Sequence, residues 1–407
     1  MANVVFVAPY ALDATTRFVA AVVRVPDTRV GLISTDPQER FPEAVRERLA
    51  GHWRLDDCLD PEQLTAGVTR LGQHLGGVDR LLAILENLQV PLAEVRERLG
   101  IPGLGVHAAH HFRDKAAMKT VFEQAGIPCA RHRRATTAAD VVAFAAGCGL
   151  PFVVKPLAGS GARSTFRIED QAQLDGWLST IRLSEDDPAM LEEFLVGAEH
   201  SFDSALIDGQ LVWHSIGRYL PTPLSVLENP WIQWCVLLPR HIDEEPFLQI
   251  TDIGVRAVRA LGLHTGFSHM EWFRRPDGSV AVSEVGARPP GAQFMTLMSW
   301  AHDTDLYAAW ARFAVHDVFD PPPRQYAVGA AYLRAQGAGR TIRAVHGLDR
   351  VSERTRSLVV ETKVPEPGRA VADTYEGDGH VVVRHPETVR VEEALAELIT
   401  TIHVETA

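Results

Sequence analysis

The sequence has few cysteines and no long apolar run. Its four cysteines, Cys58, Cys129, Cys148 and Cys235, are far apart and form no C-x-x-C pair, so they indicate neither a disulfide framework nor a zinc site. No apolar stretch is long enough to cross a bilayer, and no basic-plus-apolar signal opens the chain. We therefore expect a cytoplasmic protein with no membrane partner.

Positive charge is also scarce. The chain has 40 Lys and Arg against 52 Asp and Glu, a formal net charge of -12, which argues against a nucleic-acid partner but leaves room for a local basic pocket.

Two nucleotide-binding motifs are missing as well. No G-x-G-x-x-G follows the first expected strand, and there is no G-x-x-x-x-G-K-[ST] loop, so the dinucleotide-binding and P-loop classes have no support.

What the chain does have is enough apolar sequence for several domains. Its 407 residues are 46% hydrophobic, which suits two or three α/β domains. Residues 1–107 alternate short apolar runs with helical stretches, the pattern of an open parallel sheet. We expect a second domain over 108–318 and, after the proline run at 321–323, a small β-rich C-terminal domain over 319–407.

The clearest chemical signal is GFSHMEWFRRPDGSVAVSEVGARPPG, residues 266–291. Two alternating runs joined by Pro-Asp-Gly predict a β-hairpin. A loop with an even number of residues places His269, Glu271, Val282 and Glu284 on one face, whereas a three-residue loop separates the two glutamates. On the even register the like charges repel unless a cation such as Mg²⁺ binds both. A surface hairpin with a solvated acidic face fits the same residues.

The end of this stretch adds an anion-binding pattern. Arg288 follows Glu284 by four residues and leads into Pro289-Pro290-Gly291, a rigid turn whose backbone amides can face an anion. His269 can orient a glutamate or accept a proton from an amine, and the alternative is a structural hydrogen-bond partner.

Two lysines lie upstream in contexts that suit phosphate. A predicted helix from His110 to Ala125 carries Lys115 on its apolar stripe, where it either reaches the helix edge or points inward at an anion. The apolar strand 150–156 contains Lys155 and runs into a small-residue loop with Gly159, Ser160 and Gly161. Such a loop frees backbone N–H groups to wrap phosphate oxygens, although a surface turn is the alternative.

A third segment, residues 190–199, reads as a strand followed by a linker. The backbone of such a linker is free to hold a base, so Glu192 can accept from an exocyclic amine and Glu199 can hold ribose hydroxyls. A hairpin with an Asp208-Gly209 turn follows it. A surface acidic patch explains the same glutamates.

Taken in order, these residues resemble the ATP-grasp superfamily. The resemblance covers roughly residues 108–318, and residues 1–107 resemble the pre-ATP-grasp domain. The runs EEFL-x-G-x-E, S-H-M-E-W and E-V-G-A-R-P-P-G are most similar to carboxylate–amine ligases, including bacterial L-amino acid (dipeptide) ligases. The resemblance implies an α/β (α+β) fold with a lid lobe at about residues 125–195, binding ATP with two Mg²⁺ ions, for which Mn²⁺ can substitute.

The resemblance also implies residue roles. The nucleotide-binding set is Lys115 and Lys155 for the phosphates, Gly159, Ser160 and Gly161 closing over them, Glu192 with the backbone of Glu193 and Leu195 for adenine, and Glu199 for ribose. Magnesium would be held by Glu271 and Glu284. Arg288 and the Gly291 amide would stabilise the acyl-phosphate and the tetrahedral species, and His269 completes the candidate catalytic set.

The activity implied is ligation of a small-molecule carboxylate to an amine through an acyl-phosphate, with release of ADP and phosphate. Two alternatives stay open: a bicarbonate-using carboxylase or purine-pathway ligase of the same superfamily, and a non-catalytic ATP-binding module. The chain departs from the family at Gly286, where many members carry Asn. The resemblance therefore does not decide whether a third side chain binds the metal. The substrates do not follow from sequence, and a homodimer is compatible with it.

Overall fold

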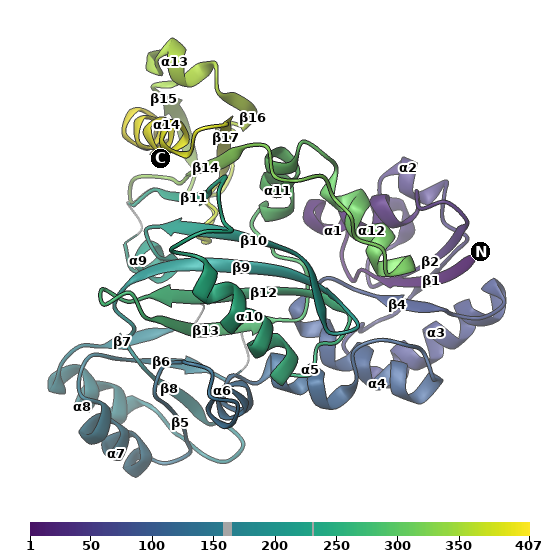
Figure 1. The fold of residues 1–407 in the computed structure, drawn as a ribbon, viewed down its shortest axis with the longest axis horizontal. Helices are drawn as coiled ribbons and strands as arrows, with labels where there is room; N and C mark the ends of the chain where they lie inside the picture. Colours follow the sequence, from purple (N-terminus) through teal and green to yellow (C-terminus); the bar gives the residue numbers. More distant parts are fainter. Residues whose placement is uncertain (158–164, 230–231) are drawn as a thin grey trace.

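The computed structural model describes residues 1–157, 165–229 and 232–407. The predicted phosphate loop with Gly159, Ser160 and Gly161 lies outside the described residues. A long central sheet occupies the middle of the molecule, with one α/β domain at the N-terminal end and a small lobe below (Figure 1). None of the helices in the described ranges combines the length and the apolar character needed to span a bilayer.

The N-terminal residues form an open parallel sheet, which confirms the prediction for this region. Its strand order is β3-β2-β1-β4, with β1 (Ala2–Val7), β2 (Thr28–Ser34), β3 (Gly51–Arg54) and β4 (Arg80–Leu82). Helices α1 (Asp13–Val22), α3 (Pro61–Leu75) and α4 (Gln89–Leu99) accompany it. Val4 and Phe6 enter one core cluster, and Val5 and Val7 enter another. Because both faces are covered, β1 is a continuous apolar run.

The central sheet has eight strands in the order β13-β12-β9-β10-β11-β14-β17-β16. Their bounds are β9 (Ala198–Ile207), β10 (Gln210–Leu220), β11 (Trp234–Leu238), β12 (Gly266–Arg274), β13 (Val280–Gly286), β14 (Ala327–Leu333), β16 (Val359–Lys363) and β17 (Gly379–His385). Residues 319–407 therefore share a sheet with the central part of the chain. The boundary at 319 stays a proposal.

The last part of the chain covers one end of this sheet. Helix α14 (Thr388–Thr401) packs on β14 and β17, and β15 (Ile342–His346) pairs with β18 (His403–Thr406) as a small ribbon. The cluster of apolar side chains beneath α14 includes Val391 and Leu395. The loop between β16 and β17 reaches the candidate site described below, where residues 373–376 line the cavity.

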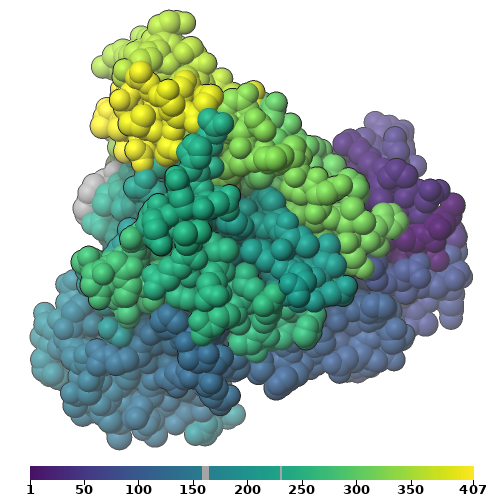
Figure 2. Space-filling view, in the orientation of Figure 1, coloured from purple at the N-terminus to yellow at the C-terminus, as the bar shows by residue number. Residues whose placement is uncertain are grey.

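The small lobe is an antiparallel sheet of its own, in the order β5-β8-β6-β7. It consists of β5 (His132–Ala135), β6 (Phe152–Pro156), β7 (Phe166–Ile168) and β8 (Ala189–Glu193), with α7 (Ala138–Cys148) and α8 (Gln171–Thr180). It has a separate apolar core around Phe144 and Phe152, and Figure 2 shows it projecting from the body at the lower left. A lobe with its own core can move as a unit.

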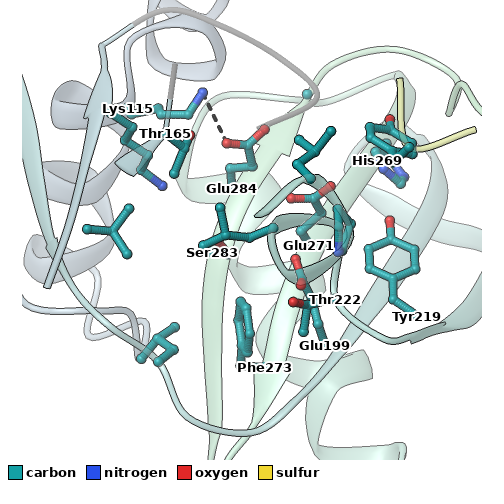
Figure 3. Close-up of a pocket in the computed structure, with 18 of the residues that line it drawn as sticks. Lys115, Thr165, Glu199, Tyr219, Thr222, His269, Glu271, Phe273, Ser283 and Glu284 are labelled. Carbon is teal, nitrogen blue, oxygen red and sulfur yellow. Dashed lines mark ion pairs between the residues drawn. The ribbon is translucent and has the colours of Figure 1, made fainter. Parts of the chain in front are cut away.

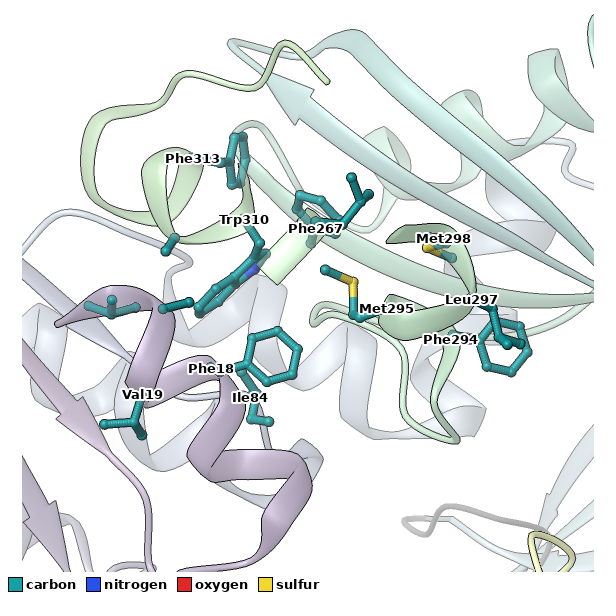
Figure 4. Close-up of a cluster of buried hydrophobic side chains, with 14 of the residues drawn as sticks. Phe18, Val19, Ile84, Phe267, Phe294, Met295, Leu297, Met298, Trp310 and Phe313 are labelled. Atoms are coloured by element: carbon teal, nitrogen blue, oxygen red, sulfur yellow. The ribbon is translucent and has the colours of Figure 1, made fainter. Parts of the chain in front are cut away.

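A shared aromatic cluster ties the N-terminal domain to the central sheet (Figure 4). Phe18 on α1 meets Trp310 on α12 (Leu306–His316) edge to face, with ring centroids 4.8 Å apart. Phe267 on β12 meets Phe313 at 5.3 Å in the same manner. Such pairs add about 0.5–1.5 kcal/mol each beyond the area they bury. The cluster therefore holds the N-terminal domain firmly against the sheet that carries the site.

The predicted helix from His110 to Ala125 is wrong in one respect. The structure has two helices, α5 (Val106–Arg113) and α6 (Lys115–Gln124). Asp114 separates them because its carboxylate accepts from the amides of Ala116 and Ala117, at 2.8 and 2.9 Å. An aspartate in this position is a helix N-cap. Lys115 thus opens α6, at the edge of the small lobe.

The predicted hairpin is present, but its register differs from the expectation. Arg275 and Ser279 are hydrogen-bonded across a three-residue loop, which by itself would put Glu271 and Glu284 on opposite faces. A β-bulge at Ser283 shifts the register, so that Glu271 pairs with Glu284 while Trp272 pairs with Val282. The two glutamates therefore share a face with His269. The expectation that Val282 joins them is wrong, because Val282 belongs to the apolar core on the other side.

One buried histidine on this sheet gives a stability prediction. His200 on β9 is stacked on Trp272, with ring centroids 4.4 Å apart, and is 5% exposed. Burial lowers the pKa of His200 to about 4, so below pH 6.5 the unfolded chain binds a proton that the folded chain refuses. The unfolding free energy is therefore complete above pH 6.5 and falls as the pH drops toward 4.

His200→Phe keeps the stacking and cannot titrate. Between pH 7.5 and 5, we expect the free energy of unfolding of this variant to fall by about 2 kcal/mol less than that of the wild type. Urea unfolding at the two pH values measures this difference. His316→Phe, a change at an exposed ring, serves as the control. Equal losses in the wild type and in His200→Phe would show that His200 does not carry this pH dependence.

Candidate active site

The predicted site residues converge on one cavity of about 570 Å³ between the central sheet, the small lobe and the N-terminal domain. Every one of them that the structure describes lines this cavity: Lys115, Lys155, Glu192, Glu193, Leu195, Glu199, His269, Glu271, Glu284, Arg288 and Gly291. Figure 3 shows Lys115 facing Glu284, with Glu271 beside it and His269 and Tyr219 further along the same wall. Residues as far apart in sequence as Lys115 and Gly291 thus meet in one place.

Buried cations face the acidic strands from the lobe side. Lys115 Nζ lies 3.0 Å from Glu284 Oε2, and Lys155 Nζ lies 2.8 Å from Glu192 Oε2. Both lysine side chains are about nine-tenths buried, so Lys115 points inward and does not reach for solvent. These ion pairs place two ammonium groups on the cavity wall.

A third lysine, Lys119, was missed at the sequence level. It is completely buried on α6, donates to the Val282 carbonyl at 3.1 Å and lies 3.8 Å from Glu192. Its spacing of four residues from Lys115 puts it on the same side of the helix, and this spacing was the signal available. Burial opposes charge on Glu192, but Lys119 and Lys155 outweigh it and lower the pKa of that carboxyl.

The two hairpin glutamates differ in their electrostatics. Burial alone would raise the pKa of Glu284, but Lys115 and Lys155 outweigh it and lower that pKa to about 2. Glu271 has no such ion pair with any residue in the described ranges, and burial together with the neighbouring charge of Glu284 raises its pKa. Burial, Glu271 and Glu284 also raise the pKa of Glu199 well above its ordinary value. Three carboxylates thus crowd this wall, and the nearby lysines do not fully offset the effect of burial and repulsion on Glu271 and Glu199.

This donor set suits a divalent cation. Glu271 and Glu284 lie opposite each other on one face of the hairpin, and their negative charges repel each other. A hard cation such as Mg²⁺ that binds between them offsets this repulsion. Within the described ranges no group of three or more His, Cys, Asp or Glu side chains gathers around one point. Water and a bound phosphate would therefore complete the coordination, as Mg²⁺ commonly allows.

His269 has a partner that the sequence did not reveal. Its Nδ1 lies 2.6 Å from Asp203 Oδ1, and Asp203 is completely buried on β9 and also accepts from Ser201 Oγ at 3.1 Å. Burial opposes charge on the imidazole, but Asp203 outweighs it and raises the pKa of His269. The histidine is therefore oriented by an aspartate on the neighbouring strand, and its ring lines the cavity.

Arg288 is held from the N-terminal domain. Its Nε donates to Glu86 Oε2 at 2.6 Å, and its Nη1 donates to the Pro289 carbonyl at 2.9 Å. Burial opposes charge on the guanidinium, yet Glu86 raises the pKa of Arg288. Glu86 was missed because it lies 202 positions away in sequence.

The turn after Arg288 has a strained backbone and an available amide. Gly291 is exposed and its amide has no acceptor among the described residues, while Ala292 and Gln293 both adopt the left-handed conformation, with φ of 49° and 63°. Non-glycine residues rarely adopt this conformation, and such strain is concentrated at functional sites. Helix α11 (Phe294–His302) starts directly afterwards.

The predicted adenine-binding backbone is only partly available. The Glu193 amide donates to the Arg131 carbonyl at 2.8 Å, and the Glu193 side chain pairs with Arg131 at 3.3 Å. The Leu195 amide has no acceptor among the described residues. The Leu195 amide is thus available to a ligand, while the Glu193 amide is already engaged.

Comparison with known proteins supports the fold. No family model matches the chain. It is 25% identical over 278 residues to the L-arginine-specific L-amino acid ligase of Bacillus subtilis, covering 66% of either chain. It superposes on the L-amino acid ligase of Bacillus licheniformis with a TM-score of 0.79 at 20% identity, over 100% of this chain and 99% of that one. The N5-carboxyaminoimidazole synthetase of Staphylococcus aureus, complexed with ADP, gives 0.71 at 15% identity, over 98% and 97%.

The sequence matches are partial. The chain spans 61%, 66% and 54% of the length of three curated relatives, that is, between about half and two thirds. The structural matches, by contrast, run over nearly the full length of both chains. The architecture of the whole chain is therefore shared with these ligases.

Proposed function

We propose that the chain is an ATP-dependent ligase of the ATP-grasp superfamily that joins a small-molecule carboxylate to an amine, with release of ADP and phosphate, as its similarity to L-amino acid ligases suggests. The observation that carries the proposal is the meeting of Lys115, Lys155, Glu271, Glu284 and Arg288 in one cavity. These groups match the charges of a triphosphate, its divalent cations and a reacting carboxylate. We place the reaction in the cytoplasm and leave room for a homodimer.

In this proposal the lysines bind the nucleotide phosphates. Lys115 and Lys155 are paired with Glu284 and Glu192 at 3.0 and 2.8 Å, so both ammonium groups are already desolvated and oriented. Exchange of one acidic partner for a phosphate keeps each charge paired. Gly159, Ser160 and Gly161 would close over the phosphates from the same lobe.

The base and ribose would lie along β8 and the linker after it. The Leu195 amide is available to a ring nitrogen, and the Glu192 carboxylate and the Glu193 carbonyl can accept from an exocyclic amine. Glu199 lies where ribose hydroxyls can donate to it. Its raised pKa suits a carboxyl that binds neutral hydroxyl groups.

Glu271 and Glu284 would hold Mg²⁺. The bound cation supplies neutralisation of the phosphate charge and polarisation of the transferred phosphoryl group. The residues of the chain do the rest: Lys115 and Lys155 orient the phosphates, and Arg288 attracts the carboxylate that must approach another anion.

The acyl-phosphate formed in this way is attacked by the amine. Arg288 and the Gly291 amide, which both line the cavity, would donate to the acyl oxygen on which negative charge develops, and fixed donors of this kind lower the barrier because they need no reorganisation. His269, oriented by Asp203, would take the proton that the amine loses. Closure of the small lobe would exclude water, which would otherwise hydrolyse the activated acyl group.

We propose amino acids as substrates, following the ligases that the chain resembles. Phosphate release measured across a matrix of pairs of amino acids, followed by mass spectrometry of the products, tests this. A product whose mass is the sum of two substrates less one water supports the ligase. ATP binding without ADP formation for any pair would favour a non-catalytic nucleotide-binding module.

A second candidate is a bicarbonate-using ligase of the purine pathway. The structural match to N5-carboxyaminoimidazole synthetases, with a TM-score of 0.71 for the ADP complex, favours it. ATP turnover that requires bicarbonate and not an amino acid would select this candidate. The sequence similarity to amino acid ligases supports the first candidate more directly.

A further inference from the structure

One acidic side chain reaches the cavity from the N-terminal domain. Within residues 1–107, all of which the structure describes, Glu86 is the residue that lines the cavity. It is the first residue of the short helix η2 (Glu86–Leu88), which follows β4. Its side chain is 14% exposed and that of Arg288 is 18% exposed, so the contact between them lies on the inner wall.

The contact fixes the plane of the guanidinium. Arg288 Nε donates to Glu86 at 2.6 Å, and Nη1 donates to the Pro289 carbonyl at 2.9 Å. A guanidinium is planar and carries five N–H groups, so hydrogen bonds from two of its nitrogens to two different anchors determine how the remaining N–H groups face the cavity. A charge-assisted bond of this length is also among the stronger ones in proteins.

Gly286 provides the space that Glu86 occupies. A Cβ placed on Gly286 would lie 2.7 Å from Glu86 Oε2, closer than real Cβ contacts allow. Gly286 ends β13 and has an ordinary backbone conformation. A glycine is therefore required here because a side chain would clash, and not because the backbone needs a positive φ. The glycine, the glutamate and the arginine therefore form one packed unit across two domains.

We propose that Glu86 is a positioning residue, which holds the Arg288 guanidinium in the orientation that the reacting carboxylate requires, and that Gly286 is needed to admit it. The inference rests on the proposed ligase function, because Arg288 acts on that carboxylate. A small misplacement of an orienting group costs much of the rate. Glu86 touches neither substrate in this proposal, and its effect passes through Arg288.

A second ion pair between the same two parts of the molecule provides a control. It tests whether the loss of any contact between the domains, and not of Glu86 in particular, lowers the rate. Arg80 on β4 forms a second ion pair between the same parts of the molecule, with Nη2 2.6 Å from Asp317 Oδ2, and neither residue lines the cavity. Asp317 has a left-handed backbone, with φ of 55°, which asparagine tolerates. Asp317→Asn therefore removes an ion pair of equal length without touching the site.

The first experiment compares the kinetics of Glu86→Ala, Glu86→Gln and Asp317→Asn in the full chain. We expect kcat of Glu86→Ala to fall about 100-fold while the Kd for a non-hydrolysable ATP analogue with Mg²⁺ stays within about threefold. Glu86→Gln keeps an acceptor for Arg288 Nε and should recover part of the rate. Asp317→Asn should keep the wild-type kcat.

Two kinetic outcomes would overturn the proposal. A wild-type kcat for Glu86→Ala would show that Arg288 needs no such partner. Equal losses in Glu86→Ala and Asp317→Asn would assign the effect to docking of the domains. If the wild type forms no ADP with any substrate pair, the proposed function fails instead.

A second experiment needs no substrate and so separates these failures. We expect Gly286→Ala to lower the melting temperature in the wild-type background and to have little effect in Glu86→Ala, because the carboxylate it would meet is then absent. Loss of the same size in both backgrounds would overturn the claim that Gly286 makes room for Glu86. Glu86→Ala alone reports whether the protein still folds.

Discussion

Glu284→Gln is expected to lower turnover about 1,000-fold, which corresponds to about 4 kcal/mol of transition-state stabilisation, while the protein stays folded. The amide has the shape of the carboxylate but lacks the charge that Mg²⁺ requires, and it weakens the attraction to Lys115, whose Nζ lies 3.0 Å from Glu284 Oε2. The loss should fall on the chemical step and on the Mg²⁺ dependence together. Phosphate release measured over a series of Mg²⁺ concentrations reports both.

Glu284→Gln should still fold, although it loses part of the attraction to Lys115 and Lys155 that lowers the pKa of Glu284. The change removes the repulsion that contributes to the raised pKa of Glu271, which offsets part of the lost attraction to Lys115. Glu376→Gln is the matched control, since Glu376 lines the same cavity from the loop between β16 and β17 and has no role in the proposed reaction. Wild-type turnover in Glu284→Gln would remove this residue from the metal site.

Local sequence patterns were sufficient to pick out many of the residues that line this cavity, whose roles stay predictions. The carboxylates at 271 and 284, the lysines at 115 and 155 and the turn at 289–291 each lie in a segment whose alternation or helical spacing is visible without the fold. Their meeting in one cavity followed from the resemblance to ATP-grasp proteins, which supplies the order of the segments in space. The predicted phosphate loop at 159–161 lies outside the described residues.

The details that failed depend on contacts between distant segments. The bulge at Ser283 reverses the effect of the three-residue loop, and it lies between Val282 and Val285, both of which are buried in the core. No pattern within the hairpin reveals that choice. Asp203 reaches His269 only because β9 lies beside β12, and Glu86 reaches Arg288 only because the N-terminal domain is packed on the central sheet.

Arg288→Lys gives the sharpest separation between binding and chemistry. The lysine keeps a positive charge that can approach Glu86, but it cannot hold Glu86 and the Pro289 carbonyl, as Arg288 does at 2.6 and 2.9 Å, and still offer a flat edge to a developing oxyanion. We expect kcat to fall about 100-fold and the Kd for ATP to change by no more than about threefold.

The reason for this ordering is that Arg288 is anchored on the side of the cavity away from the lysines. Lys155 makes its ion pair with Glu192, on the lobe side, whereas Arg288 makes its own with Glu86. Nucleotide affinity should therefore depend on Lys155 and rate on Arg288. Equilibrium binding of an ATP analogue together with steady-state phosphate release, measured on Arg288→Lys and Lys155→Gln in parallel, tests the division. A group that acts only after ATP is bound changes kcat and leaves the Kd for ATP unaltered. An Arg288→Lys protein that binds ATP weakly but turns over at the wild-type rate would therefore assign Arg288 to nucleotide binding.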